Sequence, residues 1–259
     1  SLEKTIGTVC RRIGKSLLMN DEVPLSVSVK NLEKLLGPVK FLPETVHKDD
    51  EVGIVTGMAW TQVGGDLLQI EALKLPGKGR MKTTGKLGEV MKESIDAAAS
   101  YVRSIAPQIG VKPPKFDAID IHVHVPDGAT PKDGPSAGLA MVTSIVSVLT
   151  QIPVRKDIAM TGEVSLRGNA MAIGGLKEKL LAALRGGIKT VLIPVDNEKD
   201  LAEIPANVKE GLKIIPVNHV REVLAHALVR KPEPIEWDEA AEEAAEAGKL
   251  ARSEERRVG

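Results

Sequence analysis

The segment AIDIHVHVPDGATPKDGPSAGLAMVTSIVSVLT (118–150) contains the strongest structural signals in the chain. Its first part, 118–125, alternates apolar and polar residues, which is the pattern of a strand with one buried face. Its last part, 136–150, holds apolar or small residues and no charge, so a helix there must be buried on nearly every side. The sequence therefore predicts a half-buried strand and a fully buried helix, joined by a glycine- and proline-rich loop.

The polar face of the predicted strand carries Asp120, His122 and His124, and its apolar face carries Ile119, Ile121, Val123 and Val125. Two histidines at positions i and i+2 can form part of a metal site. A third ligand would have to be a distant Asp or Glu, because no other His or Cys lies nearby. Hydrogen bonding on the polar face is the favoured interpretation.

Strands and helices are also predicted on both sides of this segment. Strand-like runs at 52–60 and 66–75 are separated by Gly64-Gly65, the usual chemistry of a hairpin turn. A helix is predicted over 87–105, with a buried side made of Val90, Met91, Ile95, Ala98, Val102 and Ile105. After 150 the pattern predicts two short strands around a turn at 166–169, a helix over 177–184, an apolar strand at 189–195 and a helix-strand-helix stretch ending at Val229.

The two ends of the chain have a different character. Apolar residues recur at helical spacing near the N-terminus, namely Leu2, Ile6, Val9, Ile13 and Leu17, and predict an amphipathic helix that needs a partner surface. An alternating run at 26–30 precedes a brief helix at 31–37, for which Asn31 is the candidate N-cap. About 45 residues bury too little to fold alone, so we expect this segment to be the end of a larger domain. Residues 231–259 predict an acidic, helical or mobile tail.

Composition excludes several classes of protein. The chain has 259 residues, with 35 basic and 35 acidic side chains and 42% hydrophobic residues, which is too apolar and too neutral for a disordered chain. No run of about 18 uncharged apolar residues could cross a membrane, and the charged first 20 residues do not form a signal peptide. Cys10 is the single cysteine, so an intrachain disulfide and a thiolate metal cluster are excluded, which fits a reducing compartment.

Nucleic-acid and phosphate binding receive little support. Residues 52–230 hold 22 basic and 18 acidic side chains, a small surplus for a nucleic-acid groove, and the chain is 2% aromatic. The glycine- and lysine-rich stretch 76–86 is similar to a P-loop, but it departs from that motif at two points. Five residues instead of four lie between Gly79 and Gly85-Lys86, and Leu87 stands where Ser or Thr is required. An exposed loop is the favoured interpretation of this stretch.

Ser136 is the candidate nucleophile. It stands at the start of the uncharged helix, where free backbone N–H groups can stabilise an oxyanion. Gly134 and Gly138 would let a substrate backbone approach closely, and the dry helix would keep the local dielectric low. A serine at this place is a simple N-cap in most proteins, so a catalytic role requires a base.

One possible base is a histidine. The sequence GPSAG around Ser136 fits the nucleophile elbow G-x-S-x-G, with Asp196 or Asp200 and His219 or His226 as partners. The elbow requires a sharp turn directly between strand and helix, whereas ten residues separate the strand from Ser136. This spacing disfavours an α/β-hydrolase.

The other possible base is a lysine with a lowered pKa. Desolvation can bring the pKa of a lysine from about 10.4 to roughly 7–8, where it can accept a proton. Lys179 lies on a predicted helix among the apolar residues Leu176, Leu180, Ala183 and Leu184. Lys177 points across that helix and is expected to face solvent.

Three separated blocks carry a family resemblance. PKDGPSAG (131–138), TGEVSLRGNAMAIGGLKEK (161–179) and RGGIKTVLIP (185–194) are similar to the proteolytic domain of Lon, an ATP-dependent AAA+ serine protease. The resemblance implies an α+β fold of the ribosomal protein S5 domain 2-like type, with a small, mainly helical N-terminal segment. It implies the end of an AAA+ helical lid subdomain at 1–45, a linker at 46–51 and the proteolytic domain at 52–230, followed by the tail.

The resemblance also implies roles for individual residues. Ser136 would be the nucleophile and Lys179 the general base, with the backbone near Ser136 as the oxyanion hole. The hydroxyl of Thr161 would hold the lysine, and Trp60 would line the substrate groove. Supporting roles are implied for Asp133, Glu163, Glu71, His122 and His124.

The implied activity is endopeptidase cleavage of unfolded, misfolded or regulatory proteins by a homohexamer. The bacterial cytoplasm is the favoured location over the mitochondrial matrix. The nucleotide-binding core would precede Ser1, so the chain itself is expected to hold no cofactor or metal, whereas the whole enzyme would use ATP and Mg²⁺. DNA binding is known in the family, and no membrane partner is expected. A Lon-like module used for assembly is the alternative; the presence of both Ser136 and Lys179 favours the enzyme.

Overall fold

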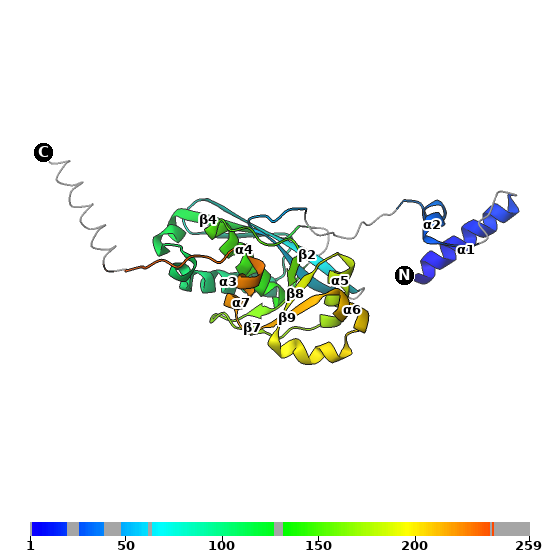
Figure 1. The fold of residues 1–259 in the computed structure, drawn as a ribbon. Coiled ribbons are helices and arrows are strands. Elements are labelled where there is room, and N and C mark those ends of the chain that lie inside the picture. Colours follow the sequence, from blue (N-terminus) through cyan, green and yellow to red (C-terminus); the bar gives the residue numbers. More distant parts are fainter. Residues whose placement is uncertain are drawn as a thin grey trace. The chain divides into compact units, whose positions relative to one another are not determined.

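The structure is a computed structural model that describes residues 2–19, 26–38, 48–61, 64–126, 132–238 and 240. The chain divides into two compact units, Ser1–Pro43 and Glu44–Gly259 (Figure 1). No helix in the described part of the chain is long and apolar enough to cross a membrane.

The described part of the small unit contains two helices, α1 (Leu2–Leu18) and α2 (Val29–Leu36). The second helix begins two residues earlier than predicted and includes the end of the alternating run. Its N-cap is Ser28 and not Asn31. The Ser28 N–H donates to Asn31 Oδ1 at 2.8 Å, so Asn31 is the third helical residue of a capping box.

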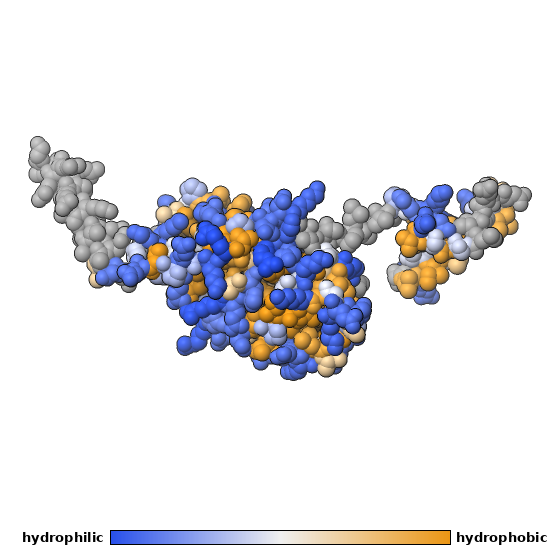
Figure 2. Space-filling view, viewed as in Figure 1, coloured by the Kyte–Doolittle hydropathy of each residue, from blue (hydrophilic) through white to orange (hydrophobic). Residues whose placement is uncertain are grey.

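The apolar face of α1 is largely exposed. Val9 is buried, whereas Leu2 and Ile6 expose 77% and 54% of their surface. Figure 2 shows this apolar surface on the small unit. The described residues of the small unit therefore supply only part of the partner surface predicted for this helix.

The large unit is built on a seven-stranded sheet with the order β3-β4-β2-β1-β5-β8-β9 (Figure 1). The strands are β1 (Ile54–Thr61), β2 (Gly64–Pro76), β3 (Met81–Thr84), β4 (Ile119–His124), β5 (Ile158–Met160), β8 (Thr190–Pro194) and β9 (Lys213–Val217). Strand β2 pairs antiparallel with β1 and β4, and the other neighbours are parallel. A separate antiparallel pair, β6 (Glu163–Val164) and β7 (Ala170–Met171), flanks the predicted turn at 166–169.

Helices connect these strands. They are α3 (Glu89–Ser104), η1 (Ala106–Ile109), η2 (Pro113–Ala118), η3 (Pro135–Ala137), α4 (Gly138–Thr150), α5 (Leu176–Arg185), η4 (Val195–Glu203), α6 (Ala206–Gly211) and α7 (Val220–Ala227). The sheet separates two apolar cores, because successive strand residues point to opposite faces. Leu68 packs in the core with α3, α4 and α7, and its neighbour Leu67 packs in the core with α5 and α6.

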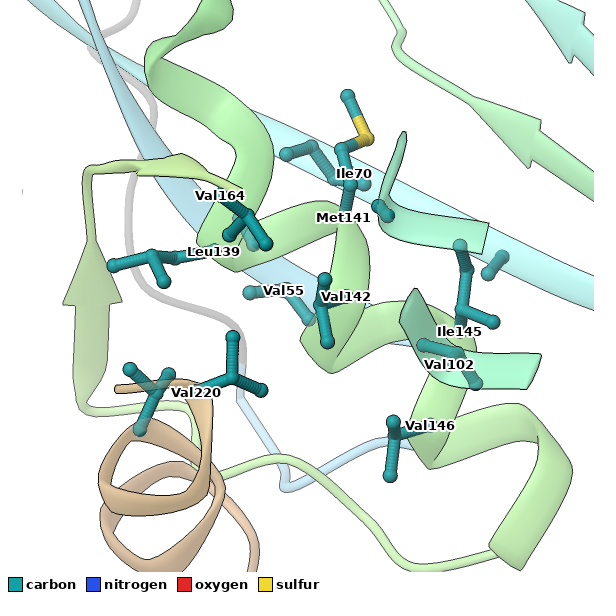
Figure 3. Close-up of a cluster of buried hydrophobic side chains, with 14 of the residues drawn as sticks. Val55, Ile70, Val102, Leu139, Met141, Val142, Ile145, Val146, Val164 and Val220 are labelled. Atoms are coloured by element: carbon teal, nitrogen blue, oxygen red, sulfur yellow. The ribbon is translucent and has the colours of Figure 1, made fainter. Parts of the chain in front are cut away.

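Helix α4 occupies the centre of the larger core, as its uncharged sequence predicts. Every residue from Gly138 to Leu149 is buried. Figure 3 shows Val142, Ile145 and Val146 of α4 among side chains from the sheet, α3 and α7. Each of the four hydroxyls on this helix donates to a backbone carbonyl; for example, Thr143 Oγ1 donates to the Leu139 carbonyl at 2.8 Å.

The hairpin between β1 and β2 differs from the prediction. Thr61 pairs with Gly64, so both glycines lie in β2 and the connecting residues are 62 and 63. Glycine is required at position 65 for another reason. A Cβ atom there would lie 1.9 Å from the Glu178 carbonyl oxygen, because α5 packs directly on this end of the strand.

Two further predictions were wrong. The stretch 76–86 is not a plain exposed loop, because residues 81–84 form β3 and pair with β4. Val90 on α3 is 44% exposed, whereas Met91 and Ile95 are buried. Each helical residue turns the chain by about 100°, so Val90 falls to one side of the stripe that Met91 begins.

The start of the C-terminal segment packs on the large unit. The Ile235 N–H donates to the Pro107 carbonyl at 2.8 Å, and Lys112 Nζ lies 5.9 Å from the Trp237 ring centroid. Most of the predicted acidic tail, residues 241–259, lies outside the described residues.

Candidate active site

Lys179 is a buried lysine on the inner face of α5. Leu176, Leu180 and Ala183 share this face and pack against the sheet, and Lys179 is 2% exposed. Lys177 is exposed, as the helical phase predicts. The backbone of α5 approaches β2 so closely at Gly65 that the sheet fixes the position from which Lys179 projects.

The amine of Lys179 has a single neutral partner. Lys179 Nζ donates to Thr161 Oγ1 at 3.0 Å, and among the described residues it has no carboxylate partner and no hydrogen bond to Ser136 Oγ. Burial lowers the pKa of Lys179 from 10.5 to about 8, because desolvation disfavours the charged form. A substantial fraction of the amine is therefore neutral at mildly alkaline pH.

Ser136 lies in η3, immediately before the buried helix α4. Its carbonyl accepts the Gly162 N–H at 2.8 Å and the Thr161 hydroxyl at 3.2 Å. The Leu139 N–H donates to the Gly162 carbonyl at 3.0 Å. Thr161 thus contacts both the serine backbone and the lysine amine, and the segment after β5 locks the start of α4 in place.

Ser136 and Lys179 line one cleft of about 400 Å³. Much of its lining is apolar and comes from β1, β2, α3 and α5, together with the segment around Ile173. The described residues that line it are Met58, Ala59, Trp60, Thr61, Asp66, Leu67, Leu68, Gln69, Met91, Pro126, Lys132, Asp133, Gly134, Pro135, Ser136, Ala137, Ala172, Ile173, Gly174 and Lys179. Concave, mainly apolar sites with a few polar groups are typical of ligand and substrate binding.

Asp133 lies in the cleft and also caps a helix. Its Oδ1 accepts the N–H groups of Met91 and Gly134, each at 3.0 Å. The Met91 N–H belongs to the first turn of α3, where backbone donors lack partners within the helix. A Cβ at Gly88 would lie 2.2 Å from the Asp133 carboxyl carbon, so glycine there permits the contact.

Trp60 lines the cleft and is 60% exposed. Its ring lies against Gly175, the N-cap of α5, where a Cβ would approach the ring to 2.7 Å. Gly175 also has a φ of +67°, in the left-handed region that favours glycine. The exposed tryptophan therefore contacts the helix that carries Lys179.

The other predicted supporting residues do not line the cleft. His122 Nε2 and His124 Nδ1 lie 2.9 and 2.7 Å from Thr84 Oγ1, so both rings hydrogen-bond the neighbouring strand. Burial, followed by Lys82 and His124, lowers the pKa of His122. Glu71 is opposite His124 on β2 and accepts a hydrogen bond from the Gln69 amide.

Glu163 is half-buried on β6 and is likewise outside the lining. Among the described residues, no group of three or more His, Cys, Asp or Glu side chains is arranged to hold a metal ion.

The histidines of the alternative triad lie elsewhere. His219 caps α7 by accepting the Arg221 N–H, and its other ring nitrogen lies 3.1 Å from the Arg167 carbonyl. His226 is exposed on α7. Neither Asp196 nor Asp200 lines the cleft.

Asn197 is a buried residue that the sequence analysis missed. It is 2% exposed and bonds both backbone groups of Ile173, at 3.0 and 2.8 Å, while its amide also donates to Asp200. It thereby fixes Ile173 at the cleft. A lone Asn in a polar stretch gives no sequence signal for this role, because the contact joins residues 24 positions apart.

Comparison with known proteins identifies the family of the chain. Residues 26–230 match the family described as Lon protease (S16) C-terminal proteolytic domain. The chain is 64% identical over 241 residues to the Lon protease of Azospirillum brasilense, covering 92% of this chain and 30% of that protein. It is 64% identical over 239 residues to the Lon protease of Brucella abortus, covering 92% and 29%, and 59% identical over 245 residues to that of Rhizobium meliloti, covering 95% and 30%. The chain thus spans about 30% of the length of these relatives, and it belongs to the family of Lon protease C-terminal proteolytic domains.

Proposed function

We propose that this chain hydrolyses peptide bonds with Ser136 as the nucleophile and Lys179 as the general base. The supporting observation is the burial of Lys179 beside Thr161 in the cleft that Ser136 lines. An uncompensated buried lysine is costly, and a pKa near 8 matches what a general base requires. No comparable base lines the cleft among the described residues.

The hydrogen bonds at Thr161 explain how the lysine would be ready to act. A hydroxyl has one proton, and Thr161 donates it to the Ser136 carbonyl, so the same oxygen accepts from Lys179. Neutral Lys179 then keeps its lone pair free. A small movement of either side chain on substrate binding would bring that lone pair to the Ser136 hydroxyl.

In the first half of the reaction, Lys179 takes the proton of the Ser136 hydroxyl while Oγ forms a bond to the scissile carbonyl carbon. Backbone N–H groups near Ser136 would stabilise the resulting oxyanion. Protonated Lys179 then gives its proton to the leaving amine as the C–N bond breaks. In the second half, Lys179 takes a proton from water as the water oxygen attacks the ester carbon. The bond between that carbon and Oγ then breaks, the acid product leaves, and Lys179 returns the proton to Ser136 Oγ.

The cleft is suited to an extended peptide. Trp60 and the apolar floor would bind side chains, while Gly134 would allow the substrate backbone to approach Ser136. For the whole protein we propose, by similarity to its relatives, ATP- and Mg²⁺-dependent degradation of unfolded, misfolded or regulatory proteins by a cytoplasmic homohexamer. We assign no nucleotide site to the described residues, and the charge of 52–230 adds no support for DNA binding.

The proposal is tested with a short fluorogenic peptide and a serine-directed boronate. We expect wild type to cleave the peptide and bind the boronate, and Ser136→Ala and Lys179→Ala to lose cleavage. Lys177→Ala is the matched control on α5 and should keep activity, because Lys177 is exposed. Wild-type activity in both dyad variants would show that the assignment is wrong. A His219→Ala, His226→Ala double variant should remain active; its inactivation would favour the histidine alternative.

A further inference from the structure

A second cavity of about 330 Å³ lies between α3, β3, β4 and η2. It shares no lining residue with the cleft of Ser136 and Lys179. Its floor is apolar and deeply buried, since Phe116, Ile121 and Ile145 are each at most 5% exposed. The volume falls within the range of small-ligand sites, so the floor could receive at least one apolar group.

Charged side chains surround the opening of this second cavity. Arg80, Asp96 and Arg103 line it and are exposed. Arg103 Nη2 donates to the Gly79 carbonyl at 3.1 Å, and its guanidinium lies 5.2 Å from the Phe116 ring centroid. These contacts fix the guanidinium and leave four of its five N–H donors for a ligand. In the described structure, neither the Arg80 guanidinium nor the Asp96 carboxylate makes a hydrogen bond, although the charge of Arg80 also acts on the nearby Asp120 carboxylate.

The spacing of Asp96 and Arg103 along α3 guides the choice of ligand. Asp96 and Arg103 are seven residues apart on α3, which places their Cα atoms about 10.5 Å apart along the helix axis. Two or three extended peptide residues span roughly 7–10 Å. A simple carboxylate would leave Asp96 without a partner.

We propose that this cavity binds a peptide of two or three residues with free termini and apolar side chains. Its ammonium group pairs with Asp96, its carboxylate pairs with Arg103 and Arg80, and a side chain rests on the apolar floor. The proposal concerns binding alone and does not depend on the proposed peptidase function.

The test is calorimetric titration of the tripeptide Leu-Ala-Leu into the Ser136→Ala variant, which is expected not to cleave it. N-acetylated and C-amidated forms of the peptide each remove one charge. We expect each blocking group to weaken binding about three- to fivefold, because one partly exposed ion pair is lost. Asp96→Asn should weaken binding of the free peptide but not of the acetylated one. Arg103→Met should weaken binding of the free peptide but not of the amidated one. Lys92→Met, a control on α3 outside the cavity lining, should change nothing.

Several results would overturn the proposal. One is equal affinity for free and blocked peptides, and another is no binding at millimolar peptide. A third is that decanoate binds as tightly as the peptide and that Asp96→Asn leaves the affinity for decanoate unchanged. A filled cavity gives a further check, because Ala99→Trp should abolish binding. Unchanged binding in a folded Ala99→Trp variant would place the peptide elsewhere. If that variant does not fold, the surface variants at 96 and 103 still decide the question.

Discussion

Replacing Lys179 by Met is expected to stabilise the protein at neutral pH. The folded state holds the lysine proton about 3 kcal/mol more weakly than the unfolded chain, because the pKa falls from 10.5 to about 8. Methionine is similar in length, unbranched and apolar, so it fits the site without this cost. Loss of the hydrogen bond to Thr161 removes about 1 kcal/mol, and Thr161 keeps its bond to the Ser136 carbonyl. The expected net gain at pH 7 is about 2 kcal/mol.

The sign of the pH dependence follows from the same pKa values. Below about pH 8 the lysine is protonated in both states and the cost is fully present. Between pH 8 and 10.5 the unfolded chain binds more protons, so wild-type stability rises with pH relative to the variant. The advantage of Lys179→Met should therefore shrink steadily as the pH is raised from 8 towards 10.

Urea unfolding followed by tryptophan fluorescence measures this effect, because Trp60 and Trp237 both belong to the large unit. Lys177→Met is the matched control, since that exposed lysine should change stability by less than about 0.5 kcal/mol at every pH. A Lys179→Met variant that is less stable than wild type at pH 7 would refute the reasoning. A difference that stays constant between pH 7 and 10 would also refute it.

Three other substitutions have defined outcomes. Thr161→Val removes the hydrogen-bond acceptor that favours protonated Lys179, so the acid limb of the peptidase pH profile should move to lower pH. The kcat should also fall about tenfold or more. An unchanged pH profile would contradict this expectation. Tyr101→Phe should raise stability by about 1 kcal/mol, seen as a higher Tm, because the buried hydroxyl has no partner among the described residues; a lower Tm would show that it has one. Gly65→Ala should lower the free energy of unfolding by about 3 kcal/mol and abolish cleavage, because the added methyl group collides with the Glu178 carbonyl and displaces α5. Near-native stability and activity in this variant would exclude the close contact.

The fold could be predicted where local pattern and burial agree. The uncharged run 138–150 is compatible only with a helix buried on all sides, which is α4. The alternation at 119–124 is compatible only with a strand buried on one face, which is β4. The turn predicted at Gly64-Gly65 was wrong because a Gly-Gly pair between two strand-like runs usually indicates a hairpin turn. Its actual requirement is the approach of α5, which is distant in sequence and leaves no mark on the local pattern.

The candidate site could be predicted in part. Helical phase alone separates buried Lys179 from exposed Lys177, and the structure agrees with that separation. Residue patterns could not decide between an N-cap and a nucleophile at Ser136, and only the family resemblance favours the nucleophile. The residues that shape the cleft, such as Asn197 at Ile173 and Gly65 at α5, act through long-range backbone contacts that a single sequence does not display.

The electrostatics of the cleft explain why a lysine can serve as a base there. A carboxylate near Lys179 would raise its pKa again and keep it protonated. Asp133 lines the same cleft, but its Oδ1 accepts two backbone N–H groups, from Met91 and Gly134, and the lysine is left with a neutral hydroxyl partner. The burial that lowers the stability of the fold is therefore the same burial that supplies a neutral amine near pH 8. A variant that restores stability by removing the lysine should remove the activity with it.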